Sequence, residues 1–410
     1  MRPMFDRHLV FFRQFDPRLW VLVSGWFVAA LGFAASIPFL SIYFHSQLGL
    51  STSQIGLFFA AQAIVRSVFQ AIGGEMSDRI GRHGLVTHSQ TIRAFSFLLL
   101  GMSIAWDWGF WWITAFFTVN SIFGSLFMPA VNALVSDILP PEKRLYGYAV
   151  ARSASNLGWA VGPAIGGFLA RTSYPSLFYL SAVLTLGSAL IFKYFLTVPP
   201  LQNAPSDKFR MRDLLAVKDD KNLATHALLT FILYLVVAQL IAPFSVYAVE
   251  MVGISESRLG LLFTLNGLLV VLLQIPITRL LAHKTFTYQL AVGSLLYFVG
   301  YGMLGILVDF EFFVFALFIV TMGEVTMSPP GLTLTSRLAP PGRLGRYLGV
   351  RGFMETAGWS LGPLYGGVIL DHFGGQPAIA WLLISSLALV AAVGYWLYGK
   401  HLPREYNIKE

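Results

Sequence analysis

One ten-residue pattern occurs twice in this chain. Residues 158–167 read GWAVGPAIGG, and residues 358–367 read GWSLGPLYGG. The paired prolines at 140–141 return at 340–341, and shorter matches begin each half. Apolar segments that repeat over such a distance indicate two copies of one helical unit, an organisation that is common in membrane transporters.

Apolar runs follow one another along the chain, and about 20 apolar residues suffice for a helix to cross roughly 30 Å of hydrocarbon. Apolar residues make up 56% of the 410, charged residues 12%, and the mean hydropathy is +0.67. Soluble proteins carry about a quarter charged residues. The sequence therefore predicts an all-α, polytopic membrane protein. It contains no cysteine, which excludes disulfides and cysteine metal sites.

The expected architecture is twelve transmembrane helices in two pseudo-symmetric six-helix bundles. The bundles cover residues 1–198 and 223–410, and a cytoplasmic connector covers 199–222. The connector is interpreted either as carrying a short surface helix or as an unstructured linker. The predicted spans are 20–44, 53–74, 85–105, 110–135, 147–170, 175–196, 223–249, 256–281, 287–308, 312–335, 347–370 and 377–399.

The basic residues are distributed asymmetrically between the breaks in the apolar runs. With the N-terminus inside, only Arg171 and Arg258 of the 28 Lys and Arg fall in outer loops, and Arg66 lies near mid-membrane. The positive-inside rule predicts this distribution. The sequence thus predicts a multi-pass protein of the cytoplasmic (inner) membrane with both termini in the cytoplasm. The net charge of +8 forms no single patch, so no nucleic-acid partner is expected.

Seven tryptophans lie where the predicted spans meet the lipid headgroups, and an interfacial aromatic belt is the expected explanation. They are Trp20, Trp106, Trp108, Trp111, Trp112, Trp381 and Trp396.

A short polar motif fills the loop between the second and third predicted spans. Residues 74–83 read GEMSDRIGRH. Asp78 closes a helix at the inner surface, where its carboxylate is placed to face the positive N-terminal end of a helix from the other half. Arg79 and Arg82 are suited to pair with acidic groups or lipid phosphates, and Gly81 permits a tight turn. The alternative is an ordinary charged loop.

This motif resembles the signature of the major facilitator superfamily, with His83 at the final basic position. The resemblance covers both halves, although residues 278–284 have lost the motif, and is nearest to twelve-span drug:proton antiporters. It implies alternating access about a central cavity, with the loop latching the two halves in the outward-facing state. Two further latch residues, one turn apart in the eleventh span, are able to pair with each other. The expected latch is Gly74, Asp78, Arg79, Gly81, Arg82, Arg351 and Glu355.

The repeated glycine–proline box is similar to a fifth-helix motif seen especially in proton-driven antiporters of that family. Glycines four residues apart let another backbone approach closely, and proline kinks a span. The box predicts a seam that slides or rocks, with plain close packing as the alternative. An earlier glycine of the motif is Ala149 here but is kept as Gly349 in the second copy. The expected seam residues are Gly158, Gly162, Pro163, Gly166, Gly167, Gly358, Gly362, Pro363, Gly366 and Gly367.

Glu324 lies near the middle of the tenth predicted span. Ionisable residues at that depth cost about 3 kcal/mol on insertion scales and are functional candidates. Desolvation favours the neutral acid, so this side chain is suited to bind and release a proton. The family resemblance places spans 1, 4, 7 and 10 around the cavity, and Glu324 is the expected coupling carboxylate. Its alternative role is to pair with a buried arginine.

The expected substrate cavity combines polar and aromatic side chains from several spans. Antiporters of this group usually carry an arginine in the fourth span, four residues before a glycine; if that glycine is Gly124, Asn120 takes the place of the arginine. Arg66, deep in the second predicted span, needs an acidic or carbonyl partner, with Glu324 and Glu355 as candidates, whereas Arg93 is expected to reach the inner surface. The cavity residues are Arg66, Asn120, Tyr43, Gln239 and Tyr247.

The resulting hypothesis is a secondary transporter that moves a small amphipathic molecule by proton-coupled efflux. No phosphate-binding loop, nucleophile elbow or zinc pair is present in the sequence, so neither enzymatic activity nor a cofactor is expected. The expected partners are the substrate, protons and membrane lipids, and the expected state is a monomer. Alternatives with the same fold are a lysolipid or glycolipid flippase and a sugar or metabolite exporter. A membrane-embedded enzyme or receptor would need a catalytic cluster or soluble sensor domain.

Overall fold

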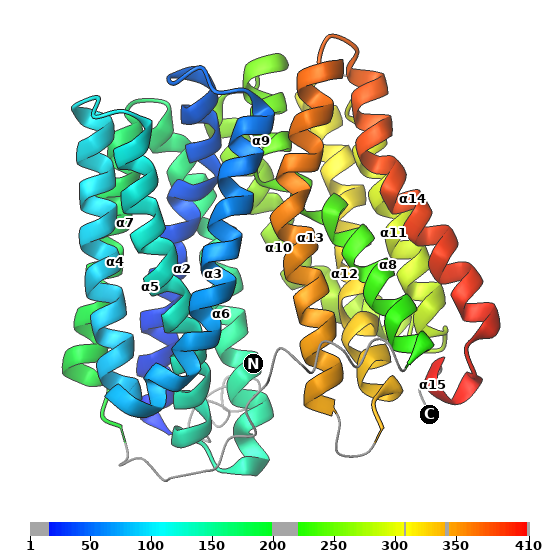
Figure 1. Cartoon of the computed structure of the whole chain (residues 1–410), viewed down its shortest axis with the longest axis horizontal. Helices are drawn as coiled ribbons and strands as arrows, with labels where there is room; N and C mark the ends of the chain where they lie inside the picture. The colour runs from blue at the N-terminus through cyan, green and yellow to red at the C-terminus, as the bar shows by residue number, and fades with distance from the viewer. Residues whose placement is uncertain (1–15, 199–219, 307–308, 341–343, 408–410) are drawn as a thin grey trace, which may run out of the picture. The chain divides into compact units, whose positions relative to one another are not determined.

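The computed structural model describes residues 16–198, 220–306, 309–340 and 344–407, apart from some side chains in α3, α6 and α13. These residues form helices and no strands, which confirms the all-α fold (Figure 1). The chain divides into two compact units. Unit 1 comprises Met1–Phe39 and Ile64–Ala204, and unit 2 comprises Leu40–Ala63 and Pro205–Glu410. The segment Leu40–Ala63, predicted within the N-terminal bundle, therefore groups with unit 2, and most of the connector lies outside the described residues.

The described helices match the twelve predicted spans in order. The first six are α2 (Pro17–Ser46), α3 (Thr52–Ile80), α4 (Arg82–Ala105), α5 (Phe110–Ile138), α6 (Pro141–Ala170) and α7 (Tyr174–Phe195). The seventh is interrupted and consists of α8 (Lys221–Val237), η2 (Ala238–Leu240), α9 (Pro243–Val246) and η3 (Tyr247–Met251). The others are α10 (Glu256–Leu280), α11 (Phe286–Met303), α12 (Phe310–Leu338), α13 (Leu344–Phe373) and α14 (Pro377–His401), followed by the short α15 (Arg404–Asn407). Seven of these stretches are long and apolar enough to cross a membrane by length and composition alone.

The helices begin at signals that the sequence carries. Side-chain oxygens of Asp220, Ser255 and Thr285 accept hydrogen bonds from the first turns of α8, α10 and α11. In unit 1, α4 and α5 instead follow Gly81 and Gly109, whose φ angles of 90° and 89° suit glycine. The tight turn predicted at Gly81 is therefore present, because one residue separates α3 from α4.

In unit 1 the repeated box lies on α6 and packs against α2. A Cβ atom added to Gly158 would lie 2.8 Å from the Cβ of Ala30, and one added to Gly166 would meet the carbonyl of Ala35. The box glycines thus let two helix backbones approach within a distance that side chains forbid. Pro163 lies inside α6 without ending the helix.

In unit 2 the second copy lies on α13 and packs against the interrupted seventh helix. A Cβ atom on Gly358 would lie 2.7 Å from the carbonyl oxygen of Phe231, and one on Gly366 would meet Oε1 of Gln239. Close packing of the box is confirmed in both units. Sliding or rocking along it stays a prediction.

The two copies differ in several helices; for example, α4 has 24 residues where its counterpart α11 has 18. Helix α2 runs unbroken for 30 residues, whereas its counterpart changes from α8 through a 3₁₀ turn and α9 to a π-helix. Helix α3 has 29 residues and its counterpart α10 has 25. The shorter helix precedes the segment where the sequence has lost the polar motif.

A stack of aromatic rings is buried in unit 2, where α11 ends and α12 and α14 begin. Tyr247 stacks on Phe313 with ring centroids 6.1 Å apart and meets Trp381 edge-on. Tyr301 stacks on the other side of Trp381. Trp381 is 0% exposed, so its predicted place in the interfacial belt is wrong. It was misplaced because a position near a helix end does not reveal which face the neighbours cover. The other belt tryptophans are partly or largely exposed.

Candidate functional site

Glu324 lies in the middle of α12 and contacts α10. Nδ2 of Asn266 donates to Oε2 of Glu324 at 3.2 Å and to Oγ1 of Thr321 at 2.9 Å. Thr321 uses its own proton on the carbonyl of Leu317 at 2.7 Å. An amide donor suits both the carboxylate and the neutral acid, because either form offers a lone pair on Oε2.

Two glycines bring α11 close to the Glu324 segment. A Cβ atom on Gly293 would lie 2.8 Å from the Cβ of Met327, and one on Gly323 would lie 2.8 Å from the carbonyl of Gly293. This approach places Tyr297 and Tyr301 of α11 within electrostatic range of Glu324. The carboxyl group therefore lies where α10, α11 and α12 meet, at a half-buried position.

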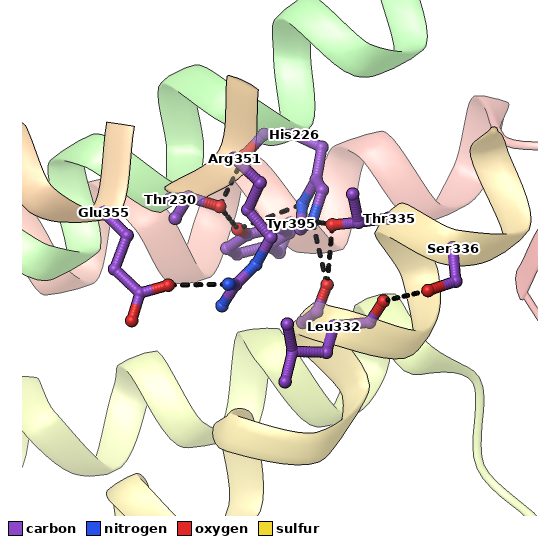
Figure 2. Close-up of polar contacts among 9 residues, drawn as sticks. His226, Thr230, Leu332, Thr335, Ser336, Arg351, Glu355 and Tyr395 are labelled. Carbon is purple, nitrogen blue, oxygen red and sulfur yellow. Dashed lines mark hydrogen bonds and ion pairs between the residues drawn. The ribbon is translucent and has the colours of Figure 1, made fainter. Parts of the chain in front are cut away.

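Arg351 and Glu355 form the predicted ion pair within α13 (Figure 2). Nη1 of Arg351 lies 2.6 Å from Oε2 of Glu355. Arg351 is 6% exposed, and its guanidinium lies beside Gly331 of α12, where an added Cβ would be 3.2 Å from Nη2. The pair is confirmed. Its part in a latch stays a prediction.

His226 forms a second buried polar network next to this pair (Figure 2). Its Nε2 lies 3.0 Å from Oγ1 of Thr335 and 3.2 Å from the carbonyl of Gly331, and its Nδ1 lies 3.3 Å from the hydroxyl of Tyr395. Thr335 donates its own proton to Gly331. This pattern is satisfied by a neutral ring that carries its proton on Nε2 and accepts from Tyr395 at Nδ1. Sequence reasoning missed this network, although a histidine inside an apolar span was a usable signal.

Arg93 lies far inside unit 1 and does not reach the inner surface, so that expectation is wrong. It is the twelfth residue of α4, about 16 Å along the helix axis from the first, and is 6% exposed. Its Nη1 donates to Oε1 of Gln90 at 2.8 Å, and its Cζ lies 5.7 Å from the ring centre of Phe33. The expectation was wrong because Arg93 lies eight residues into the predicted span 85–105, and its side chain packs against Phe33 of α2 and Gly124 of α5.

Most predicted cavity residues brace helices in this structure. Nδ2 of Asn120 donates to the carbonyl of Arg93 at 3.3 Å, and Nε2 of Gln239 donates to the carbonyls of Leu235 and Gly362. The hydroxyl of Tyr247 donates to the carbonyl of Leu304. Tyr43 is buried as well.

Arg66 is exposed on α3. Its expected pairing with Glu324 or Glu355 would join the two units and stays a prediction.

The polar motif is described only in part. The side chains of Asp78 and Arg79, together with Gly74, lie outside the described set. Arg82 forms an ion pair with Asp137 and donates to the carbonyl of Ala133 at 3.1 Å. These contacts tie the start of α4 to the end of α5 within unit 1. The latch itself stays a prediction.

Asp371 near the end of α13 caps the start of α3 within unit 2. Its Oδ1 accepts from the backbone N–H of Thr52 at 2.8 Å, and its Oδ2 accepts from that of Ser53 at 2.9 Å. Gly367, one turn earlier, lies against the carbonyl of Thr52. Burial opposes the charged form of Asp371, but hydrogen bonds from Ser53, Ser51 and the Thr52 backbone outweigh it and lower the pKa of this carboxyl.

Long apolar helices with glycine seams and buried ionisable side chains are typical of a membrane transporter. The model of the Major Facilitator Superfamily matches residues 22–363 and 227–410. The chain therefore belongs to the major facilitator superfamily.

Relatives and solved structures match nearly the whole chain. It is 30% identical to the uncharacterized MFS-type transporter YttB of Bacillus subtilis, over 93% of this chain and 95% of that protein. It is 25% identical to the multidrug resistance protein MdtH of Yersinia enterocolitica, over 91% and 92%. Among solved structures, it is similar to the nucleoside transporter NupG at a TM-score of 0.78 and 13% identity, over 93% of this chain and 99% of that one. A bacterial homolog of the human lysosomal transporter Spinster matches at 0.76 and 14% identity, over 95% and 97%.

Proposed function

We propose that this protein is a proton-coupled secondary transporter that exports a small amphipathic molecule by alternating access. Family membership and the similarity to multidrug resistance proteins such as MdtH support export of such a compound. The observation that carries proton coupling is the setting of Glu324. Its carboxyl group lies at the junction of three helices and accepts from the amide of Asn266, which tolerates both protonation states.

In the proposed cycle Glu324 binds a proton from the outer side and releases it to the cytoplasm. Protonation removes a negative charge from a partly desolvated position, so the neutral and charged forms favour different surroundings. Each form would stabilise a different arrangement of the helices around the site. Inward proton flow would then drive the substrate outward.

The seams and the polar motif complete the proposal. The helices α6 and α2 meet through glycines, and so do α13 and α8. Few side chains at these contacts would therefore clash when the helices shift. The motif at residues 74–83 would latch one end of the cycle. The protein would lie in the cytoplasmic membrane as a monomer with both termini inside. Cysteines introduced one at a time into outer and inner loops test this topology by labelling, because the chain has no cysteine of its own.

The test is transport in proteoliposomes with an imposed pH gradient. Uptake of ethidium and of charged naphthalene probes into inside-out vesicles is compared for wild type, Glu324→Gln and Glu311→Gln. Glu311 is exposed in the first turn of α12 and serves as the matched control. We expect Glu324→Gln to lose gradient-driven accumulation by at least tenfold and Glu311→Gln to match wild type. Unchanged accumulation in Glu324→Gln would remove this carboxyl from coupling.

A further inference from the structure

Unit 1 buries a positive charge to which its described residues offer no negative partner. Arg93 is 6% exposed. The ion pairs described in this unit join Arg18 to Asp16 and Arg82 to Asp137, and none includes Arg93. Burying a guanidinium removes it from water, and this penalty exceeds what one neutral hydrogen bond and an aromatic contact offset. A buried cation in this setting is suited to bind an anionic ligand reversibly.

The guanidinium has one edge that no described residue pairs with, and this edge is buried. Of its five N–H donors, one on Nη1 is used by Gln90. Nε is buried and has no hydrogen-bond partner among the described residues. Nε and Nη2 form the edge that binds a carboxylate through two parallel hydrogen bonds.

Gly124 of α5 packs beside this unpaired edge. A Cβ atom added there would be 3.4 Å from Nε and 3.8 Å from Nη2. Because glycine has no side chain, nothing from this position covers the two donors. Asn120 lies one turn earlier on α5, and its Nδ2 donates to the backbone carbonyl of Arg93. This hydrogen bond positions the part of α4 that carries the guanidinium.

Aromatic surface adjoins the charge. The ring of Phe33 lies under the guanidinium and meets Trp159 of α6 edge-on, with centroids 5.9 Å apart. Both rings are half-buried, so each offers uncovered surface. A ligand that fits this corner combines one anionic group with a flat apolar body.

We infer that Arg93 is the anion-recognition residue of a substrate site in unit 1, and that the transported molecule is an aromatic or similarly flat apolar carboxylate or sulfonate. This inference rests on the proposed export function and narrows its substrate class. Phe33 and Trp159 would hold the apolar body, while the Nε–Nη2 edge of Arg93 would hold the anionic group.

The test uses two probes with the same ring system and opposite charge, 1-naphthaleneacetate and 1-naphthylmethylammonium. Binding to the purified full-length protein in detergent is measured by calorimetry at low ionic strength. Wild type is expected to bind the anion at least tenfold more tightly than the cation. Arg93→Gln should lose at least tenfold in affinity for the anion only, and Gly124→Val, which covers Nε, should weaken the anion in the same direction.

Gln90→Glu keeps the arginine and supplies an internal carboxylate 2.8 Å from Nη1. It should also lose at least tenfold in anion affinity, and it decides the question if Arg93→Gln does not fold. Arg171→Gln removes an exposed charge from the same unit and should behave as wild type. The inference is overturned if wild type prefers the cation or binds neither probe. It is also overturned if the anion affinity of Gln90→Glu and of any folded Arg93→Gln falls by less than tenfold.

Binding and transport separate this inference from the proposed function. Arg93-dependent anion binding without gradient-driven transport would sink proton-coupled export and leave the anion site standing. If gradient-driven export is the same in Arg93→Gln as in wild type, the anion site at Arg93 is refuted and proton-coupled export stands.

Discussion

Each unit buries one arginine against a glycine of a neighbouring helix, but only one of the two has a carboxylate. Arg93 and Arg351 are both 6% exposed. A Cβ atom on Gly124 would approach the first guanidinium to 3.4 Å, and one on Gly331 would approach the second to 3.2 Å. Arg351 pairs with a glutamate one turn later, whereas Arg93 contacts the neutral Gln90 one turn earlier.

This difference shows that two arginines in similar packing differ in whether a carboxylate neutralises their charge. In unit 2 the charge of Arg351 is compensated within α13 by Glu355, although its Nε, like that of Arg93, has no hydrogen-bond partner among the described residues. In unit 1 the corresponding compensation is missing, and an external anion is the simplest source of it. A single side chain, Gln90 against Glu355, decides between a structural ion pair and a binding site.

The largest effect on stability is expected from Glu355→Gln. Removing one partner of a buried ion pair costs about 3–5 kcal/mol, and because Glu355 is 31% exposed we expect about 3 kcal/mol. Thermal unfolding in detergent measures the loss. The double variant with Arg351→Gln should recover part of it, since no unpaired charge then remains. A loss below about 1 kcal/mol would contradict the contrast between the two arginines.

The seams offer a second contrast, because the same box glycine faces different atoms in the two units. Gly166→Ala would push a methyl group into the backbone carbonyl of Ala35, and we expect a loss of about 3 kcal/mol. Gly366→Ala meets the side-chain amide of Gln239, which can move only by giving up its hydrogen bonds to Leu235 and Gly362, so a smaller loss of about 2 kcal/mol is expected.

Both seam variants are compared with a glycine that faces open space in a helix of the same unit. Gly187→Ala in α7 and Gly352→Ala in α13 meet nothing within 4 Å and should be neutral or stabilising by up to about 1 kcal/mol. Equal losses in Gly166→Ala and Gly366→Ala would show that the side chain of Gln239 is as rigid as backbone.

Gln90→Glu should stabilise unit 1, in addition to its effect on anion binding. A carboxylate at this position would make a charge-assisted hydrogen bond with Arg93, and the expected gain is about 1–2 kcal/mol. Thermal unfolding of the ligand-free protein is the measurement. Because Nε2 of Gln90 also donates to Oγ of Ser188 at 3.3 Å, the variant loses that hydrogen bond, and only a destabilisation beyond about 1 kcal/mol would mean that the charge of Arg93 is already compensated.

The smallest effect concerns Asp371 and depends on pH. Its pKa in the folded protein is lower than in the unfolded chain, where a value of about 3.9 applies. The stability that this cap contributes, about 1 kcal/mol, is therefore present above the unfolded value and is lost as the pH falls through the folded one. Asp371→Asn should remove this dependence, whereas Asp309→Asn should not, since the Asp309 side chain caps no backbone N–H. Parallel pH profiles for wild type and Asp371→Asn would refute the assignment.

Local pattern predicted the features that depend on neighbours in sequence. Apolar runs gave the helices, glycines at four-residue spacing gave the seams, and a four-residue interval gave the Arg351–Glu355 pair. Each of these requires only the geometry of one helix. The family resemblance was equally accessible, because residues 74–83 and the repeated box carry it.

Contacts between distant segments were not accessible in the same way. Asp371 and Thr52 are 319 residues apart, and nothing near either residue identifies the other. The burial of Trp381 and the inward turn of Arg93 depend on which helix faces which, and helical periodicity does not determine this when apolar residues surround the whole helix. The interrupted helix at Ala238–Met251 was also unexpected, since Pro243 resembles the prolines that other helices here accommodate without a break.

Helix α10 is four residues shorter than α3, a difference of one turn or about 6 Å. If an ancestral duplication produced the two halves, this turn is one of the places where they diverged. In the proposed cycle, two identical halves would give no preference for the inward-facing or the outward-facing state. The second copy is a turn shorter here and has lost the polar motif, so we expect the resting protein to favour one orientation without help from any solute.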